Sequence, residues 1–307
     1  MRVAIIGQQA FGKAVLDAFL ARGDTVAGVF VAPDAPGARP DALRAGAEEK
    51  GVPVFAVERY GAPEASEALR RLDTDLGTMA YVTAFVPQSF VRVPRHGTIQ
   101  FHPSLLPLHR GPSSINWAII LGKSRTGLSI FRPVDGLDEG PVLLQKEVAI
   151  GPDDTVGSLY FDKIFPLGVT ALLEAADVVV AGKASERRQD ESQASYEGWV
   201  HEAESRINWA NHVDLTYNLM RGCNPAPGAW TTVEGRRLYL FDARKHVAPT
   251  FARVKGIGLG EVAEVSATSL FIHGQGGFIE VLRCRFENGK KIAASDAGIA
   301  PGTLLGT

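Results

Sequence analysis

Residues 100–111 read Gln-Phe-His-Pro-Ser-Leu-Leu-Pro-Leu-His-Arg-Gly, and they continue an apolar run, Gly97 to Phe101, that predicts a β-strand. Pro103 and Pro107 each lack an N–H and fix φ, so neither a strand nor a helix can continue through them. His102 is therefore predicted at the end of a strand, on a stiff loop. In an open α/β sheet, ligands bind at the carboxyl ends of the strands.

A second polar segment lies beyond a further apolar run, Gly127 to Phe131. It reads Asp-Gly-Leu-Asp-Glu-Gly over residues 135–140, and a turn there brings the carboxylate of Asp138 to the edge of the sheet that holds His102. A histidine and an aspartate at such an edge form a reasonable acid/base unit. On spacing alone the structural interpretation stays open, because a histidine at a strand end is commonly a hydrogen-bonded structural residue and Asp-Gly turns are common.

Strands and helices alternate through the first part of the chain. Short apolar or β-branched runs predict strands, and apolar residues spaced three and four apart predict helices. The strands are expected at 2–6, 25–31, 52–57, 76–83, 97–101, 127–132 and 142–150, and the helices at 12–21, 41–50, 62–72, 113–121 and 155–181. Pro166 should kink or divide the last helix. This alternation predicts an α/β domain with a mostly parallel sheet and right-handed crossovers.

The remainder of the chain has a different pattern. Residues 182–199 are polar and broken, which favours a connection between domains. A helix is expected near 211–221, and short strands separated by glycine turns follow at 229–233, 237–241, 260–265, 269–273 and 278–286. Such spacing is typical of a small β-barrel. We therefore expect a catalytic domain at 1–182, a linker at 183–206 and a C-terminal domain at 207–307.

The composition is that of an ordinary globular chain. Its 307 residues predict two domains, and a net charge of −2 gives no global surface for a polyanion. The two cysteines, Cys223 and Cys284, suit a reducing cytosol. No apolar run is suited to a signal peptide or long enough to span a membrane, so a cytoplasmic location without a membrane partner is expected. No His, Cys or carboxylate cluster has metal-ligand spacing, so no metal is expected.

The first strand is followed by Gly-Gln-Gln-Ala-Phe-Gly-Lys-Ala, residues 7–14. This segment nearly fits the phosphate-binding loop G-x-x-x-x-G-K-[ST], but Ala14 has no hydroxyl for magnesium, and the second glycine of the dinucleotide fingerprint is missing. We interpret it as a tight strand-to-helix turn rather than a nucleotide site.

The two polar segments together resemble the signature of the folate-dependent formyltransferase family: an amide-x-His, then Ser-Leu-Leu-Pro, then Gly, with Asp-Gly-Leu-Asp-x-Gly further on. The likeness extends over nearly the whole chain. Asn-Pro-Ala-Pro-Gly-Ala-Trp at 224–230 resembles the entry to the C-terminal barrel of methionyl-tRNA formyltransferases. Within the family, the chain looks most similar to the hydrolase domain of 10-formyltetrahydrofolate dehydrogenase, on segments such as 94–97, 115–117 and 196–198.

The resemblance implies a Rossmann-like catalytic domain and an OB-like C-terminal barrel. It places the family's catalytic histidine on His102 and its essential aspartate on Asp138, with Gln100 where the transferases have Asn and the hydrolase branch tends to have an apolar residue. The implied folate pocket consists of Ala84, Phe85, Val86, Ser104, Leu105, Leu106, Pro107 and Asp138. The dehydrogenase continues into a carrier domain and an aldehyde-dehydrogenase domain that are not found up to Thr307, so no NAD(P) is expected.

In this family's chemistry a formyl group on a weakly basic arylamine nitrogen is attacked at carbon, and the resulting oxyanion collapses by expelling the protonated nitrogen. We expect His102, hydrogen-bonded to Asp138, to stabilise the oxyanion and to protonate the leaving nitrogen. Asp138 orients the ring and accepts the proton of the nucleophile. Gln100 is a candidate second donor to the oxyanion, and Asp135 is interpreted as a turn residue.

Three functions follow from these expectations. The favoured one is hydrolysis of 10-formyltetrahydrofolate to tetrahydrofolate and formate. The second is formyl transfer to an amine of initiator methionyl-tRNA or of a sugar nucleotide, and the third is a folate-binding module without turnover.

A small-molecule folate is the expected partner, and tRNA is an alternative that the charges do not favour. Residues 32–43, where the tRNA enzymes carry a basic insertion, contain only Arg39 against Asp34 and Asp41. From Val200 onward the chain has twelve Lys or Arg and ten Asp or Glu, so its positive charge is too weak to favour binding of a polyphosphate. The sequence does not indicate the oligomeric state.

Overall fold

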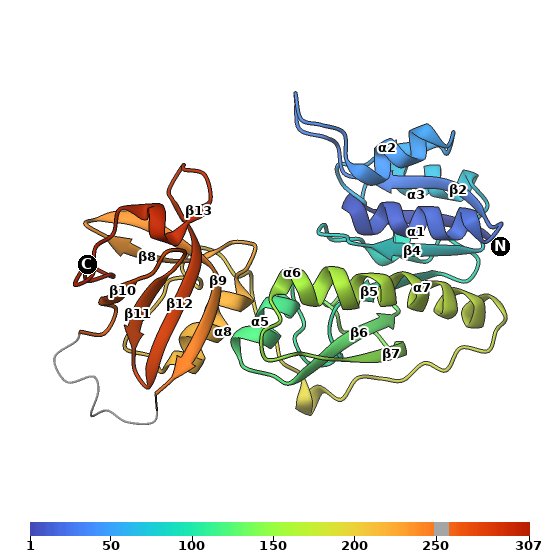
Figure 1. Cartoon of the computed structure of the whole chain (residues 1–307). Coiled ribbons are helices and arrows are strands. Elements are labelled where there is room, and N and C mark those ends of the chain that lie inside the picture. Colours follow the sequence, from blue (N-terminus) through green and yellow to red (C-terminus); the bar gives the residue numbers. More distant parts are fainter. Residues whose placement is uncertain (249–257) are drawn as a thin grey trace. The chain divides into compact units, whose positions relative to one another are not determined.

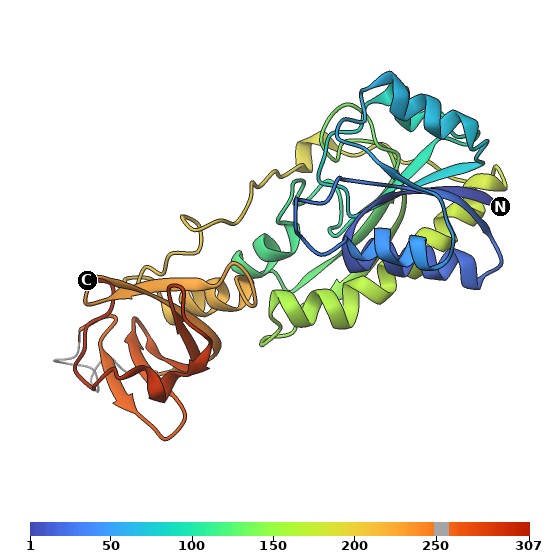
Figure 2. The same ribbon diagram turned by 90° about the horizontal axis from the view of Figure 1, so that it is seen from above.

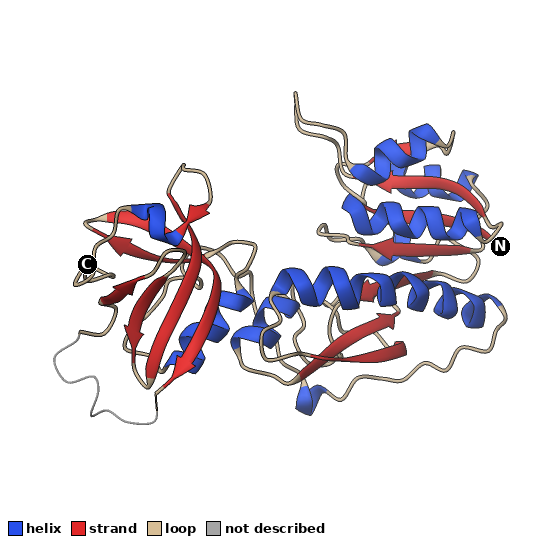
Figure 3. Ribbon diagram, in the orientation of Figure 1, coloured by secondary structure: helices blue, strands red, loops and turns tan. Residues whose placement is uncertain are grey.

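The computed structural model describes residues 1–248 and 258–307, which divide into two compact units (Figure 1). The α/β unit consists of residues 1–112, 127–148 and 163–197. The β unit consists of residues 113–126, 149–162 and the described residues from 198 onward. Helices alternate with strands in the α/β unit, whereas strands predominate in the β unit (Figure 3).

A seven-stranded sheet has the order β3-β2-β1-β4-β5-β6-β7. Its strands are β1 (Arg2–Gly7), β2 (Thr25–Val31), β3 (Val54–Ala56), β4 (Leu76–Ala80), β5 (Thr98–His102), β6 (Arg125–Phe131) and β7 (Val142–Ala149). The pairs β1–β2, β1–β4, β2–β3 and β4–β5 are parallel, and β5–β6 is antiparallel. The prediction of an α/β fold with a mostly parallel sheet is confirmed.

Helices cover both faces of this sheet (Figure 2). One face carries α1 (Gln9–Ala21), α2 (Ala42–Glu49) and α7 (Phe165–Val180), and the other carries α3 (Pro63–Arg71) and α4 (Gln88–Val91). Because alternate strand residues point to opposite faces, Ile6 of β1 packs with Leu69 of α3 and Phe90 of α4. On the other face, the rings of Phe11 in α1 and Phe165 in α7 meet edge to face.

The strand order reverses between β1 and β4, and in such sheets ligands bind beyond the strand ends near the reversal. Gly7 ends β1 because the backbones are closely packed there: a Cβ at this position would lie 2.0 Å from the carbonyl oxygen of Ala80. The N–H of Gln8 donates to the same oxygen at 3.3 Å. A close approach of two strands therefore explains the glycine in this strand-to-helix turn.

The long apolar segment around Pro166 is divided, as expected. It forms a short helix, α6 (Val156–Ser158), then a π-helical turn (Leu159–Ile164), and then α7, in whose first turn Pro166 lies. Proline is tolerated there because the N–H groups of the first helical residues have no acceptor within the helix, so a missing one costs no hydrogen bond.

The β unit contains an antiparallel sheet in the order β10-β11-β12-β9-β8, with β13 beside β12. Its strands are β8 (Ala229–Val233), β9 (Arg236–Val247), β10 (Val262–Val265), β11 (Leu270–Gly274), β12 (Gly277–Phe286) and β13 (Ile292–Ala293). The unit's helices include α5 (Ser114–Ile120) and α8 (Val213–Gly222). The predicted C-terminal β domain is confirmed. β9 continues beyond the expected end at Phe241. The prediction stopped there because the second half of the strand is charged and lacks the alternation that predicts a strand.

Candidate active site

A cavity of about 180 Å³ lies in the α/β unit, between the segment that follows β4 and the segment that follows β6. Five of the residues expected in the site line this cavity: Ala84, Phe85, Val86, Gln100 and Asp138. Asp135, which we interpreted as a turn residue, also lines it. The cavity therefore brings together two segments that are about fifty residues apart in the sequence.

The loop Ser104–Pro107 lies elsewhere, because the described residues that line the cavity do not include it. Ser104 is fully buried, and its hydroxyl donates to the carbonyl of Leu108 at 2.6 Å. Leu106 packs with Phe131 and Val142 in a small apolar cluster. Residues 104–107, which the resemblance assigned to the folate pocket, are therefore not among the described residues that line this cavity.

His102 and Asp138 form a pair that is almost completely buried. Nδ1 of His102 lies 3.5 Å from Oδ2 of Asp138, and the two side chains are 7% and 5% exposed. Nε2 of His102 lies 2.9 Å from the carbonyl oxygen of His109. A carbonyl can only accept, so Nε2 carries a hydrogen, and Nδ1 is the nitrogen that faces the carboxylate. A proton held between Nδ1 and Oδ2 would join the two groups as an ion pair.

The backbone at Asp138 is held in an uncommon conformation. Its φ is +57°, and His109 in the facing loop has φ of +55°. Non-glycine residues rarely adopt the left-handed region unless the surroundings stabilise it, and such residues concentrate at functional sites. Oδ2 of Asp138 accepts the N–H of Gly111 at 2.9 Å, so this turn points the carboxylate toward the loop that carries His102.

Residues 187–197, which we call the strap, are hydrogen-bonded along this loop. Arg110 and Tyr196 form a parallel β-bridge. The hydroxyl of Ser195 accepts the N–H of His109 at 2.8 Å, and Glu197 Oε2 lies 3.1 Å from Nδ1 of His109. We had expected this stretch within a linker between domains, but up to residue 197 it belongs to the α/β unit.

Sequence reasoning assigned no role to the polar side chains of the strap. Gln189 and Glu191 both bond to Arg110, whose side chain is 6% exposed. The hydrogen bond to Glu191 is the main reason that the pKa of Arg110 is raised. The one signal available was the family-like segment at 196–198.

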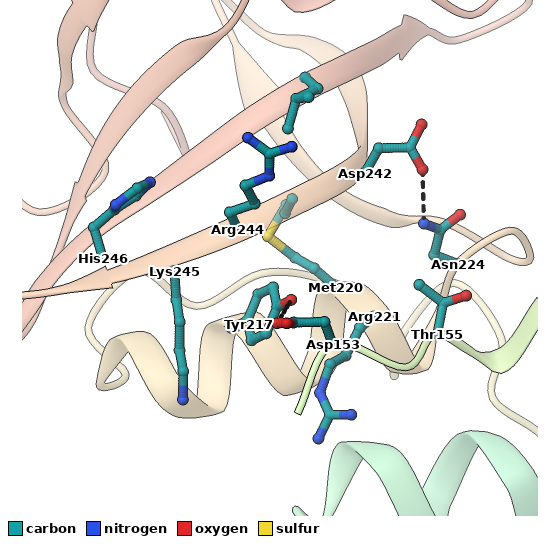
Figure 4. A pocket seen from close by; sticks show the side chains of 12 residues that line it. Asp153, Thr155, Tyr217, Met220, Arg221, Asn224, Asp242, Arg244, Lys245 and His246 are labelled. Carbon is teal, nitrogen blue, oxygen red and sulfur yellow. Dashed lines mark hydrogen bonds between the residues drawn. The ribbon is translucent and has the colours of Figure 1, made fainter. Parts of the chain in front are cut away.

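A second cavity, of about 490 Å³, lies within the β unit between α8 and β9 (Figure 4). The hydroxyl of Tyr217 donates to Asp153 at 2.8 Å, and the Asn224 amide donates to Asp242 at 3.0 Å. Burial is the main cause of the raised pKa of Tyr217. No residue expected in the active site lines this larger cavity, and its carboxylates are already held by neighbouring donors.

Within residues 1–248 and 258–307, no group of three or more His, Cys, Asp or Glu residues is arranged to hold a metal ion. In the same residues, no helix has both the length and the apolar character needed to cross a membrane.

Residues 1–175 match the family described as formyl transferase, and residues 200–298 match the formyl transferase C-terminal domain. The chain belongs to the formyltransferase family. Members of this family are enzymes, and the matched segments cover the small cavity, the His102–Asp138 pair and most of the β unit. The resemblance read from the two polar segments is thus confirmed.

Two kinds of curated relatives are similar to this chain. It is 36% identical over 304 residues to the cytosolic 10-formyltetrahydrofolate dehydrogenase of Xenopus laevis, a match that covers 96% of this chain but 34% of that protein. It is 31% identical over 315 residues to the methionyl-tRNA formyltransferase of Geobacter metallireducens, covering 100% of this chain and 99% of that protein. The chain thus spans about a third of the dehydrogenase and nearly all of the transferase.

Solved structures share the fold of this chain at low identity. HypX from Aquifex aeolicus in complex with tetrahydrofolic acid has a TM-score of 0.70 at 17% identity, covering 96% of this chain and 46% of that one. WlaRD, a sugar 3N-formyl transferase crystallised with dTDP and 5-N-formyl-THF, has a TM-score of 0.68 at 16% identity, covering 92% of this chain and 97% of that one.

Proposed function

We propose that this chain hydrolyses 10-formyltetrahydrofolate to tetrahydrofolate and formate. The observation that carries the proposal is the buried His102–Asp138 pair, of which Asp138 lines the small cavity together with Gln100. The similarity to 10-formyltetrahydrofolate dehydrogenases supports the choice of substrate. Water is the acceptor in this proposal, so the reaction requires no second organic substrate.

The walls of the cavity suit the ring system of a folate. Phe85, Val134 and Leu137 line it while remaining 67%, 37% and 52% exposed, so they offer apolar surface at its mouth. The backbone of residues 84–86 offers N–H and C=O groups to the polar edge of a pterin. A pocket of this size takes the ring end of the substrate and leaves the rest outside, where the apolar mouth packs against the arylamine.

The proposed reaction uses the pair as one unit that holds and returns a proton. Asp138 accepts a proton from water as the water oxygen bonds to the formyl carbon, and this proton is shared with Nδ1 of His102. The positive charge on the imidazole and the amide of Gln100 stabilise the oxyanion. The carbon–nitrogen bond then breaks, the pair returns the proton to the leaving nitrogen, and formic acid ionises to formate.

The test is to incubate the purified chain with 10-formyltetrahydrofolate without any amine acceptor and to follow formate by NMR. We expect formate and tetrahydrofolate to appear in equal amounts, at a rate proportional to protein concentration. Tight binding of the folate without any formate would instead identify a folate-binding module.

Formyl transfer to an amine is the second candidate, because the methionyl-tRNA formyltransferase matches over its whole length and a sugar 3N-formyl transferase shares the fold. Adding methionylated initiator tRNA, or an amino-sugar nucleotide, to the same assay separates the two functions. Formylated acceptor at the expense of formate would favour transfer and contradict hydrolysis as the main reaction.

A further inference from the structure

Gln189 in the strap has a side-chain amide that makes four hydrogen bonds. Its Nε2 donates to the carbonyl oxygens of Asp138 and Gly140, both at 2.7 Å. Its Oε1 accepts from Nε and Nη2 of Arg110, at 3.2 and 2.9 Å. The amide thus spans the gap between the turn that carries Asp138 and the loop that carries His102, without lining the small cavity itself.

These bonds close a ring of contacts around the acid/base pair. His102 Nε2 bonds to the carbonyl of His109, and His109 is joined covalently to Arg110. Arg110 bonds to Gln189, which bonds to the backbone of Asp138, and the Asp138 carboxylate faces His102 again. Every member of the ring belongs to the α/β unit.

We propose that Gln189 is a positioning residue that fixes the Asp138 carboxylate against His102. The left-handed backbone at Asp138 is unfavourable by itself, and the amide of Gln189 holds the carbonyl of that same residue. A primary amide is required because one end must donate to carbonyls while the other accepts from a guanidinium. Through its kinetic readout, this inference rests on the hydrolysis proposed above.

The need to balance the charge of Arg110 does not explain why a glutamine lies at position 189. Glu191 receives both Nη1 and Nη2 of Arg110, at 2.8 and 2.7 Å, and supplies the counter-charge. What Gln189 adds is directional: two donated hydrogen bonds at the turn that no carboxylate can make. Replacing it with glutamate keeps the size and the contact with Arg110 but sets a negative charge against two carbonyl oxygens.

The critical variant is therefore Gln189→Glu, with Gln193→Glu as its matched control. Gln193 lies in the same strap, is exposed, and donates only to Asp190 in the described structure. We expect Gln189→Glu to lower kcat by about tenfold to a hundredfold, with KM changed less than about twofold, because small displacements of a reacting group cost rate more than binding. Gln193→Glu should keep both constants. A kcat for Gln189→Glu within about twofold of the parent would contradict the proposal.

A double-mutant cycle separates positioning from a general loss of structure. If Gln189 acts through Asp138, the Gln189→Glu change should add less than about a twofold loss in an Asp138→Asn background. Equal losses in both backgrounds would show that Gln189 only supports the fold.

A readout without turnover keeps this inference distinct from the proposed reaction. The amide resonance of Gly111, whose N–H donates to Asp138 Oδ2, and the ring resonances of His102 should shift in Gln189→Glu and not in Gln193→Glu. Shifts in a chain that releases no formate would retain the positioning role and reject hydrolysis. Unchanged resonances would reject the positioning role whatever the activity.

Discussion

The two cavities differ in a way that size does not reveal. The larger one, in the β unit, has carboxylates that accept from the neutral side chains of Tyr217 and Asn224. The smaller one, in the α/β unit, is lined by Asp138, whose carboxylate lies 3.5 Å from the buried ring of His102. Burying ionisable groups costs free energy unless neighbours compensate for it. We therefore expect the chemistry to follow the buried histidine–carboxylate pair rather than the volume of the cavity.

The largest difference in kcat should appear when one carboxylate in each cavity is replaced by an amide and the two variants are compared. We expect Asp138→Asn to lower kcat by about 10²–10³, similar to the loss of a key charge-stabilising group, and Asp153→Asn to leave it unchanged. Formate release measured by NMR checks both. Glu139→Gln, one residue from Asp138 and exposed, is the control, and a large loss in Asp153→Asn would undo the comparison.

Removing the hydroxyl of Tyr217 tests whether the larger cavity serves stability. Tyr217→Phe deletes a hydrogen bond to a carboxylate, so the free energy of unfolding should fall by about 1–2 kcal/mol while turnover stays the same. Denaturant unfolding measures this. Tyr196→Phe, whose side chain is 61% exposed, should stay within about 0.5 kcal/mol of the parent. A loss of turnover in Tyr217→Phe would mean that the larger cavity takes part in the reaction.

The apolar mouth of the smaller cavity should contribute to binding. Phe85→Ala removes an aromatic ring, and a stacking contact of about 0.5–1.5 kcal/mol corresponds to a rise in KM of roughly twofold to tenfold. We expect kcat to change little, since the proposed reaction gives the ring no part in proton transfer. Steady-state kinetics with 10-formyltetrahydrofolate give both constants, and an unchanged KM would show that the folate lies elsewhere.

The smallest effect concerns pH. Burial raises the pKa of Cys223 to about 12 and that of Cys284 to about 11, from 9.0 in the unfolded chain. The folded state then keeps a proton that the unfolded chain loses, so this stability is complete below pH 9 and is lost as pH rises through 11 to 12. Between pH 8 and 11, the free energy of unfolding should fall less steeply with pH in Cys284→Ala than in the parent. Identical slopes would contradict the prediction.

Local sequence patterns predicted the strands and helices of the α/β unit well. Residues 25–31 form a strand with the expected ends, because a strand covered on both faces reads as a continuous apolar run. The charged second half of β9 gave no such signal. This half of β9 pairs with β12 through the backbone, and such pairing leaves no pattern in the side chains.

Prediction of the site was uneven for a physical reason. The family-like motif placed His102 and Asp138 in one site, and their side chains lie 3.5 Å apart. Their catalytic roles stay predictions. Whether the side chain of Leu106 faces the cavity or the core depends on its packing with Phe131 and Val142, two residues that lie outside the motif. Local sequence patterns could not predict the contacts of Gln189, because its hydrogen-bond partners are 49 to 79 residues away in the chain.

The strap also has a consequence for how the protein is made. A ribosome delivers His102 and Asp138 long before it delivers residues 187–197, yet the bonds to Arg110, His109 and the Asp138 turn come from that later segment. A nascent chain that has emerged as far as residue 182 holds the complete sheet and both partners of the pair, but it lacks the tie between them. We therefore expect the proposed activity to appear late in synthesis, after the sheet itself has formed.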